Sequence, residues 1–290
     1  MTQFQLVKTR TSDNIYLSGL FVEGDTAKPA VVYLHGFEGD FYSHKFIIDI
    51  ANTFDSNKFT LLSVQTRGTG GKTWFLDKEG NAKYIGSHFE LLEEAFLDID
   101  AWVKFLVEKG YENIIIAGHS LGTIKVIRYL FEGELKDMIK KLVLMCPFDK
   151  NGQENLVTRG KWRTYLNLAK KKIDQGKGTR YILKGWEEVN MSYQTFYSWY
   201  QEDDLGSMFD FYRPDYDFPV LNRISIPVHI LVGTKDEFFH RTNPDNPQEA
   251  MDILLKNLKH GSGKLIENAK HSFGGYEEKL VNSILDFLSQ

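Results

Sequence analysis

The strongest constraint on the fold is a series of short, largely apolar segments that alternate with longer segments of helical periodicity. The short segments cover residues 30–34, 59–64, 113–117, 141–145 and 228–232. Strands of a parallel sheet have this composition because helices cover both faces of the sheet. The alternation therefore predicts an α/β fold, in which a mainly parallel central sheet carries helices on both faces.

Helical periodicity is clearest in residues 89–107, where apolar residues recur every three or four positions and Gly110 follows as a stop signal. Similar spacing is found in residues 46–54, in a segment that ends near residue 131, and in residues 248–258 and 276–288. Shorter β-rich runs at residues 15–21 and 264–266 complete the set of predicted elements.

The region from residue 148 to residue 222 departs from this alternation. It contains a basic segment of helical pattern, residues 161–172, and then a dense group of aromatic residues: Tyr181, Trp186, Tyr193, Phe196, Tyr197, Trp199, Tyr200, Phe209, Phe211, Tyr212, Tyr216 and Phe218. Because it lies between two predicted core strands, we expect an insertion folded over one edge of the sheet. The predicted organisation is a core of residues 1–147 and 223–290 with a cap, or lid, formed by residues 148–222.

Charge and cysteine content exclude several classes of protein. A net charge of -4 gives no electrostatic attraction to nucleic acid or to anionic membranes. The single cysteine, Cys146, excludes an intramolecular disulfide and a multi-cysteine metal site, and its place at the end of an apolar run predicts a buried thiol. No segment reaches the roughly 18 consecutive apolar residues of a membrane span, and no signal peptide is visible. We therefore expect a cytoplasmic protein with no nucleic-acid or membrane partner.

The pentapeptide Gly118-His119-Ser120-Leu121-Gly122 directly follows a predicted strand and precedes a helical pattern. A serine on such a turn has a strained backbone, and the flanking glycines remove Cβ atoms that would collide. The turn presents the hydroxyl to solvent and places the Leu121 N–H at a helix N-terminus, where it can donate to a developing oxyanion. The pattern in this context predicts that Ser120 is a nucleophile, and the alternative is a turn whose serine is idle.

A serine hydroxyl needs a general base, and four histidines follow Ser120 in the chain. His229 lies inside a predicted strand, His260 stands at a helix end beside a glycine, and His240 comes soon after the candidate acid. His271 lies between the last short strand and the last helix, where a loop presents it over the sheet edge. We therefore predict that His271 is the base.

The orienting acid is expected after the strand of residues 228–232. Asp236 emerges there, on the side of the sheet where open α/β folds place their sites, and it precedes His271 by enough residues for one helix and one strand. Glu237 is the alternative acid. If Asp236 is the acid, Glu237 is instead a solvated charge on the loop. We predict Asp236.

A second oxyanion donor is expected after an early strand, in the segment His35-Gly36-Phe37. Gly36 permits a tight turn, so that the Phe37 N–H and the Leu121 N–H can form an oxyanion hole together. For His35 the sequence favours a structural role in holding this loop over a role as catalytic base.

In order and approximate spacing, these motifs resemble the α/β-hydrolase superfamily over nearly the whole chain. The resemblance implies eight mainly parallel strands, a triad of Ser120, Asp236 and His271, and a helical cap between strands six and seven, where residues 148–222 fall. Within the superfamily the sequence is similar to small lidded carboxylesterases, including acyl and feruloyl esterases. One departure is Gln65, which stands where many relatives have an aspartate.

The predicted function is a serine hydrolase that cleaves carboxylic esters through an acyl-enzyme, with no metal and no organic cofactor. The substrate is expected to be a small-molecule ester, with an apolar or aromatic group if the aromatic residues of the cap line a pocket; otherwise these residues pack the cap on the sheet. A thioesterase, a C–C hydrolase or a peptidase would use the same triad. An alternative of another class is a catalytically silent binding protein on the same fold.

Overall fold

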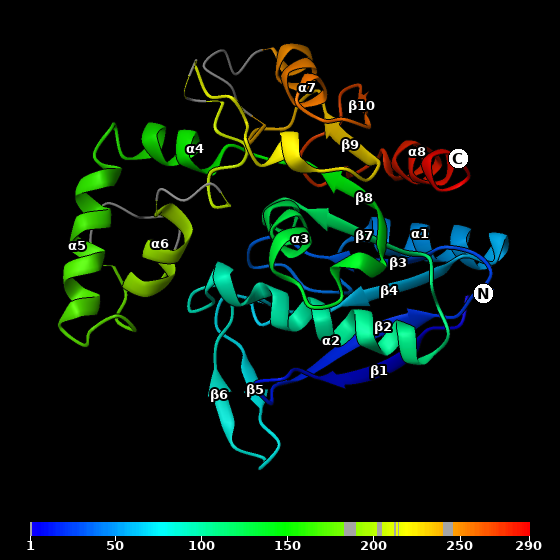
Figure 1. The fold of residues 1–290 in the computed structure, drawn as a ribbon, viewed down its shortest axis with the longest axis horizontal. Coiled ribbons are helices and arrows are strands. Elements are labelled where there is room, and N and C mark those ends of the chain that lie inside the picture. The colour runs from blue at the N-terminus through cyan, green and yellow to red at the C-terminus, as the bar shows by residue number, and fades with distance from the viewer. Residues whose placement is uncertain (1, 183–189, 202–204, 212, 214, 240–245) are drawn as a thin grey trace.

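The computed structural model describes residues 2–182, 190–201, 205–211, 213, 215–239 and 246–290. Its central sheet has eight strands, in the spatial order β1 (Gln5–Arg10), β2 (Tyr16–Val22), β4 (Thr60–Val64), β3 (Ala30–Leu34), β7 (Ile114–His119), β8 (Ile139–Met145), β9 (Val228–Gly233) and β10 (Gly261–Ile266) (Figure 1). β1 and β2 pair antiparallel with each other, and β2 pairs antiparallel with β4. The other neighbours are parallel, which confirms the predicted α/β fold.

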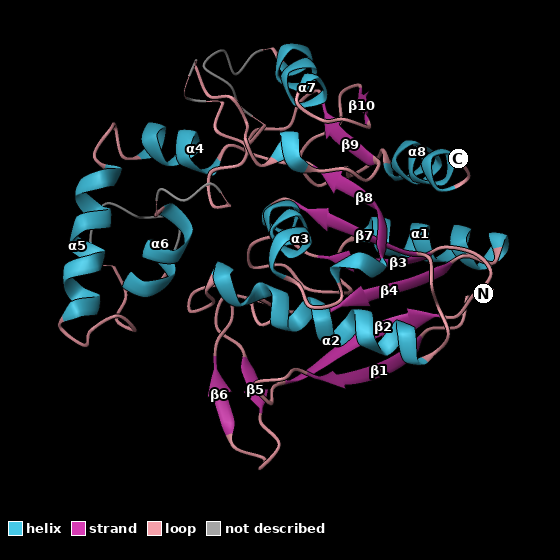
Figure 2. Cartoon of the chain, viewed as in Figure 1, coloured by secondary structure: helices cyan, strands magenta, loops and turns pink. Residues whose placement is uncertain are grey.

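Helices cover both faces of the sheet (Figure 2). One face carries α1 (Lys45–Asn57) and α8 (Glu277–Leu288), and the other carries α2 (Ala95–Glu108), α3 (Leu121–Glu132) and α7 (Pro247–Lys256). In β3, Val31 and Tyr33 pack toward α1 and α8, whereas Val32 and Leu34 pack toward the opposite helices. A strand with two buried faces is apolar throughout for this reason, as the sequence pattern indicates.

In the described part of the chain between β8 and β9 there are three α-helices: α4 (Lys150–Val157), α5 (Trp162–Asp174) and α6 (Tyr193–Tyr200). The basic segment predicted as a helix is α5. Figure 1 shows these helices beyond the carboxyl ends of the parallel strands. Phe196 and Trp199 of α6 belong to a large cluster of buried hydrophobic residues, which also includes Ile124 of α3. Trp186 and Tyr212 lie outside the described residues.

Several elements differ from the predicted ones. β1 and the hairpin of β5 (Trp74–Leu76) and β6 (Ala82–Tyr84) have no counterpart in the prediction, because their residues are largely exposed and carry little apolar pattern. The helix predicted from residue 89 begins at Ala95, after a 3₁₀ turn at Leu92–Glu94. Two further 3₁₀ turns, Lys136–Met138 and Leu221–Arg223, precede β8 and β9.

The late start of α2 has a tertiary cause. The carbonyl oxygen of His88 accepts hydrogen bonds from the Ser192 amide and the Thr195 hydroxyl, and the Leu92 amide donates to the Ser198 hydroxyl at 2.8 Å. The backbone of residues 88–92 is thus engaged by α6, about a hundred residues later in the chain, which local sequence cannot indicate. Among the described helices, none combines the length and apolarity needed to cross a membrane.

Candidate active site

Ser120 occupies the sharp turn between β7 and α3. Its backbone has φ 54° and ψ -121°, a left-handed region that side chains rarely adopt. A Cβ atom at Gly118 would lie 2.4 Å from the Gly122 carbonyl oxygen, and one at Gly122 would lie 2.7 Å from the Leu34 carbonyl oxygen. Both glycines are therefore sterically required, as expected from the pentapeptide.

The turn is held from both sides. The Ser120 amide donates to the Met145 carbonyl oxygen at 2.8 Å, and the Thr123 hydroxyl donates to the Ser120 carbonyl oxygen at 2.6 Å. A Cβ atom at Gly36 would lie only 2.8 Å from the Ser120 Cβ, so the loop after β3 passes directly beside this serine. The Ser120 side chain remains partly exposed.

The predicted oxyanion donors are Phe37, next to Gly36, and Leu121, the first residue of α3. In the described part of the chain, neither backbone N–H donates a hydrogen bond to another residue. Gly36 and Ser120, the residues that precede Phe37 and Leu121, lie against each other. The two N–H groups are therefore available to an oxygen atom of a bound substrate.

His35 holds the loop that carries Phe37, which confirms its predicted structural role. Its Nδ1 donates to the Gly36 carbonyl oxygen at 2.8 Å, and its Nε2 accepts from the Thr69 hydroxyl at 2.7 Å. Burial, and then the positive charge of Lys125, lower the pKa of His35 to about 3. His35 is therefore neutral near pH 7, in keeping with both hydrogen bonds.

The structure brings Asp236 and His271 together from the loops that follow β9 and β10. Nδ1 of His271 lies 2.9 Å from Oδ1 and 3.0 Å from Oδ2 of Asp236, whose side chain is 1% exposed. Burial acts to raise the pKa of Asp236, but hydrogen bonds and charge attraction from His271 outweigh it and lower this pKa. The carboxylate thus stays ionised and fixes a proton on Nδ1, which leaves Nε2 free to act as a base.

Glu237, the alternative acid, does not contact the imidazole ring. It accepts a 3.4 Å hydrogen bond from the backbone N–H of His271 and is exposed. His229 lies in β9 between the hydroxyls of Ser262 and Ser283, as expected for a core residue. His260 lies in the turn before β10 and not at a helix end, because Asn257 already caps α7; His240 lies outside the described residues.

His119 directly precedes Ser120 and lies beside His271. The centroids of the two imidazole rings are 4.9 Å apart. Among the hydrogen bonds of the described residues, none joins Ser120 Oγ to the His271 ring. Such bonds are often long without substrate and tighten in the reactive complex.

The family of the chain follows from its sequence match. Residues 31–281 match the alpha/beta hydrolase family, and this segment is well over half of the 290 residues. The chain belongs to the alpha/beta hydrolase family. A search of curated protein sequences finds no significant match.

Several solved structures share the fold of this chain at low sequence identity. Est1E from Butyrivibrio proteoclasticus, solved with ferulic acid bound, has a TM-score of 0.65 and 17% identity, with 97% of each chain covered. The esterase Pf2001 from Pyrococcus furiosus has a TM-score of 0.61 and 18% identity, with 99% of this chain and 91% of that chain covered. The alpha/beta hydrolase GrgF from Penicillium sp. sh18 has a TM-score of 0.68 and 16% identity, with 99% and 98% covered.

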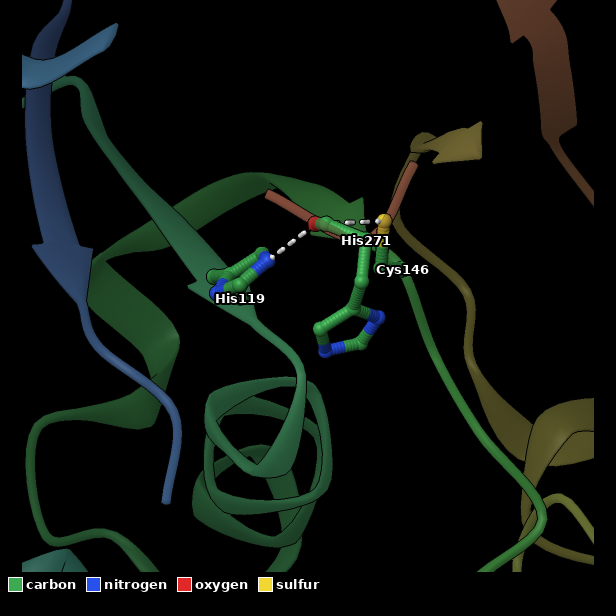
Figure 3. Close-up of side chains that lie close together, drawn as sticks. All are labelled: His119, Cys146 and His271. Atoms are coloured by element: carbon green, nitrogen blue, oxygen red, sulfur yellow. Dashed lines mark hydrogen bonds between the residues drawn. The ribbon is translucent and has the colours of Figure 1, made fainter. Parts of the chain in front are cut away.

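Two residues of this alpha/beta hydrolase to which the sequence assigns no role in the site also touch His271. His119 Nε2 and Cys146 Sγ lie 2.8 Å and 3.4 Å from its carbonyl oxygen (Figure 3). Cys146 is fully buried at the end of β8, as predicted. The side-chain donor atoms of His119, Cys146 and His271 lie within 4.8 Å of one another, a spacing within reach of a shared metal ion. However, His119 and Cys146 both point at the carbonyl oxygen, so the geometry is that of a hydrogen-bonded cluster.

Part of the aromatic region of this alpha/beta hydrolase lines a hollow on the surface. A surface hollow of about 340 Å³ is lined by Phe211, Tyr216 and Phe218 on one side and by residues of α7 on the other. Ser120, Asp236 and His271 are not part of its lining.

Proposed function

We propose that this protein is a serine hydrolase that cleaves carboxylic esters through an acyl-enzyme on Ser120. The observation that carries the proposal is the pairing of His271 with a buried, ionised Asp236, on the loops that flank the strained Ser120 turn. An acid that fixes the histidine tautomer and a serine held in a strained, partly exposed turn are the parts that acyl transfer needs.

In the proposed mechanism, His271 Nε2 takes the proton of Ser120 Oγ as the oxygen attacks the ester carbonyl carbon. The N–H groups of Phe37 and Leu121 stabilise the oxyanion of the tetrahedral intermediate, and Asp236 stabilises the imidazolium. His271 then protonates the leaving alcohol. A water molecule, deprotonated by His271, attacks the acyl-enzyme, and His271 returns the proton to Ser120 Oγ as the carboxylic acid is released.

We further propose that residues 148–222 form a cap over this site. Two contacts support this role: the ring of Trp199 on α6 meets that of Phe37 edge-on at 5.3 Å, and the α6 segment bonds to the backbone of His88. The cap therefore rests on the same residue that offers an oxyanion donor. The proposed substrate is a small-molecule ester whose acyl or alcohol group is apolar or aromatic, in line with the ferulic acid bound to Est1E.

Substitution Ser120→Ala tests the proposal with a p-nitrophenyl ester of a short acyl chain. Loss of the nucleophile should lower kcat by about 10⁴-fold or more while thermal unfolding stays near that of the wild type. The matched control is Ser289→Ala, which removes an exposed hydroxyl at the end of α8. Retention of most of the activity in Ser120→Ala would remove Ser120 from the mechanism.

Leaving-group profiling separates the ester reaction from the others that the same residues support. Matched oxygen ester, thioester, amide and β-diketone substrates are compared by kcat/KM. We expect the oxygen ester to be turned over fastest. A thioester, amide or C–C substrate turned over faster than its oxygen ester would reassign the reaction, and the absence of any turnover and of any acylation would favour the binding-protein alternative.

A further inference from the structure

The backbone carbonyl of His271 receives two side-chain hydrogen bonds. His119 Nε2 lies 2.8 Å and Cys146 Sγ lies 3.4 Å from this oxygen. Figure 3 shows both side chains converging on the oxygen, with the His271 ring directed away from it. Two side-chain donors on one backbone carbonyl restrict the position of this oxygen.

The chemistry of the acceptor fixes the state of both donors. A carbonyl oxygen only accepts, so His119 carries its proton on Nε2 and Cys146 is a thiol. Burial, and then the charge of His271, lower the pKa of His119 to about 3. Burial, and then the charge of Asp236 and a side-chain hydrogen bond with Asp236, raise the pKa of the Cys146 thiol well above its ordinary value. Burial therefore favours the neutral, hydrogen-bond-donating form of both groups.

Both donors are built into the frame that holds the nucleophile. His119 is the last residue of β7 and directly precedes Ser120. Cys146 directly follows Met145, whose carbonyl oxygen accepts the hydrogen bond from the Ser120 amide. Its own amide donates to the Leu231 carbonyl oxygen at 2.8 Å, which ties it to β9 as well. The two donors thus connect the loop of His271 to the residue before Ser120 and to the residue after Met145, the hydrogen-bond partner of Ser120.

We infer that His119 and Cys146 are positioning residues that hold the backbone of His271 at the distance from Ser120 that proton transfer requires. This inference rests on the proposed role of His271 as the base. Asp236 sets the rotation of the imidazole ring, whereas the pair of donors sets the place of the main chain that carries it. A displacement of about 1 Å between reacting groups costs about 100-fold in rate, so such a restraint is expected to act on kcat.

Matched substitutions separate a positioning role from a general loss of stability. His119→Met and Cys146→Ala remove the donors, whereas His119→Gln and Cys146→Ser keep a donor near the same place. The double variant His119→Met/Cys146→Ala should lose about 10- to 100-fold in kcat, with KM changed less than about threefold. The double variant His119→Gln/Cys146→Ser should recover to within about fivefold of the wild type.

His229→Gln is the stability control, because it disturbs a buried histidine of the same sheet that touches only Ser262 and Ser283 among the hydrogen-bond partners described. It should lower the unfolding temperature and leave kcat unchanged. A double variant without donors that keeps the kcat of the wild type would overturn the inference. If that double variant does not fold, the single variants Cys146→Ala and Cys146→Ser are compared instead. The inference then predicts a lower kcat in the alanine variant alone, and an equal kcat in both would overturn it.

Hydrogen exchange gives a readout that does not depend on activity. The amides of residues 269–273 should exchange at least about tenfold faster in the donor-free variant than in the wild type, and unchanged exchange would overturn the inference whatever the kinetics. An inactive wild type, or an active Ser120→Ala, would instead refute the proposed function. The two failures are therefore distinguishable.

Discussion

The buried ion pair of Lys125 and Glu90 gives the sharpest test of the packing behind the candidate site. Lys125 lies on α3, the helix that starts after Ser120, and its Nζ is 2.6 Å from Glu90 Oε2, with each side chain 1% exposed. Glu90 Oε1 has no hydrogen-bond partner among the described residues, and a Cβ atom at Gly68 would lie 2.1 Å from the carboxylate. The carboxylate is thus enclosed, and Lys125 neutralises it.

The substitution Lys125→Met keeps the length and apolar stem of the side chain but leaves the charge of Glu90 unpaired. Removing one partner of a buried pair costs about 3–5 kcal/mol. The entropy of unfolding, about 2.1 cal/mol/K for each residue, amounts to about 0.6 kcal/mol/K for 290 residues. The midpoint of thermal unfolding should therefore fall by about 5–8 °C.

Circular dichroism at pH 7 measures this midpoint. The matched control is Lys104→Met on α2, where the ion pair with Glu108 is 3.9 Å long and both side chains are more than half exposed. A surface pair contributes about 0–1 kcal/mol, so its loss should shift the midpoint by less than about 2 °C. The double variant Glu90→Gln/Lys125→Met should recover much of the loss. A midpoint for Lys125→Met equal to that of Lys104→Met would refute the reasoning.

Three further predictions concern charge, pH and steric fit. Asp236→Asn should lower kcat by about 10⁴-fold with KM little changed, as steady-state kinetics would show, and a loss below tenfold would argue against its role. Burial lowers the pKa of His35 and His119 to about 3 and that of His229 to about 4, so the unfolded chain takes up protons below about pH 6.5 that the native state does not. Native stability should therefore fall between pH 7 and pH 5, by up to about 2 kcal/mol for each histidine, and urea unfolding of His229→Gln should show a weaker pH dependence than the wild type. An equal pH dependence of stability in the two proteins would contradict this prediction. Gly118→Ala should lower the free energy of unfolding by about 1–3 kcal/mol and reduce turnover, because its Cβ would meet backbone atoms that cannot move away. A variant with the stability and turnover of the wild type would contradict this prediction and show that the turn relaxes.

The strands that the sequence predicts most clearly are those with two buried faces. Val31, Val32, Tyr33 and Leu34 of β3 are all buried, so the strand is recognisable without knowledge of its neighbours. β1 alternates between exposed and half-buried positions at the sheet edge, and nothing in its residues separates it from a loop. The start of α2 depends on contacts with α6, which local sequence does not contain.

A similar distinction applies to the candidate site. The contact between Asp236 and His271 is predictable because each residue follows a recognisable strand and parallel strands end at one edge of the sheet. The contacts of His119 and Cys146 are not predictable, because their acceptor is a backbone carbonyl, which every residue has. The sequence pattern places His260 at a helix end because Gly261 follows it, whereas that glycine begins β10 and the helix ends at Lys256.

Covalent labelling with a fluorophosphonate tests the central claim most directly, because it requires an activated serine and no knowledge of the natural ester. Intact mass and peptide mapping of the labelled protein should show one adduct, on the peptide that contains Ser120. Labelling should be absent in Ser120→Ala and slowed by orders of magnitude in His271→Ala. A wild type that carries no adduct on Ser120, or that labels as fast without His271, would contradict the account.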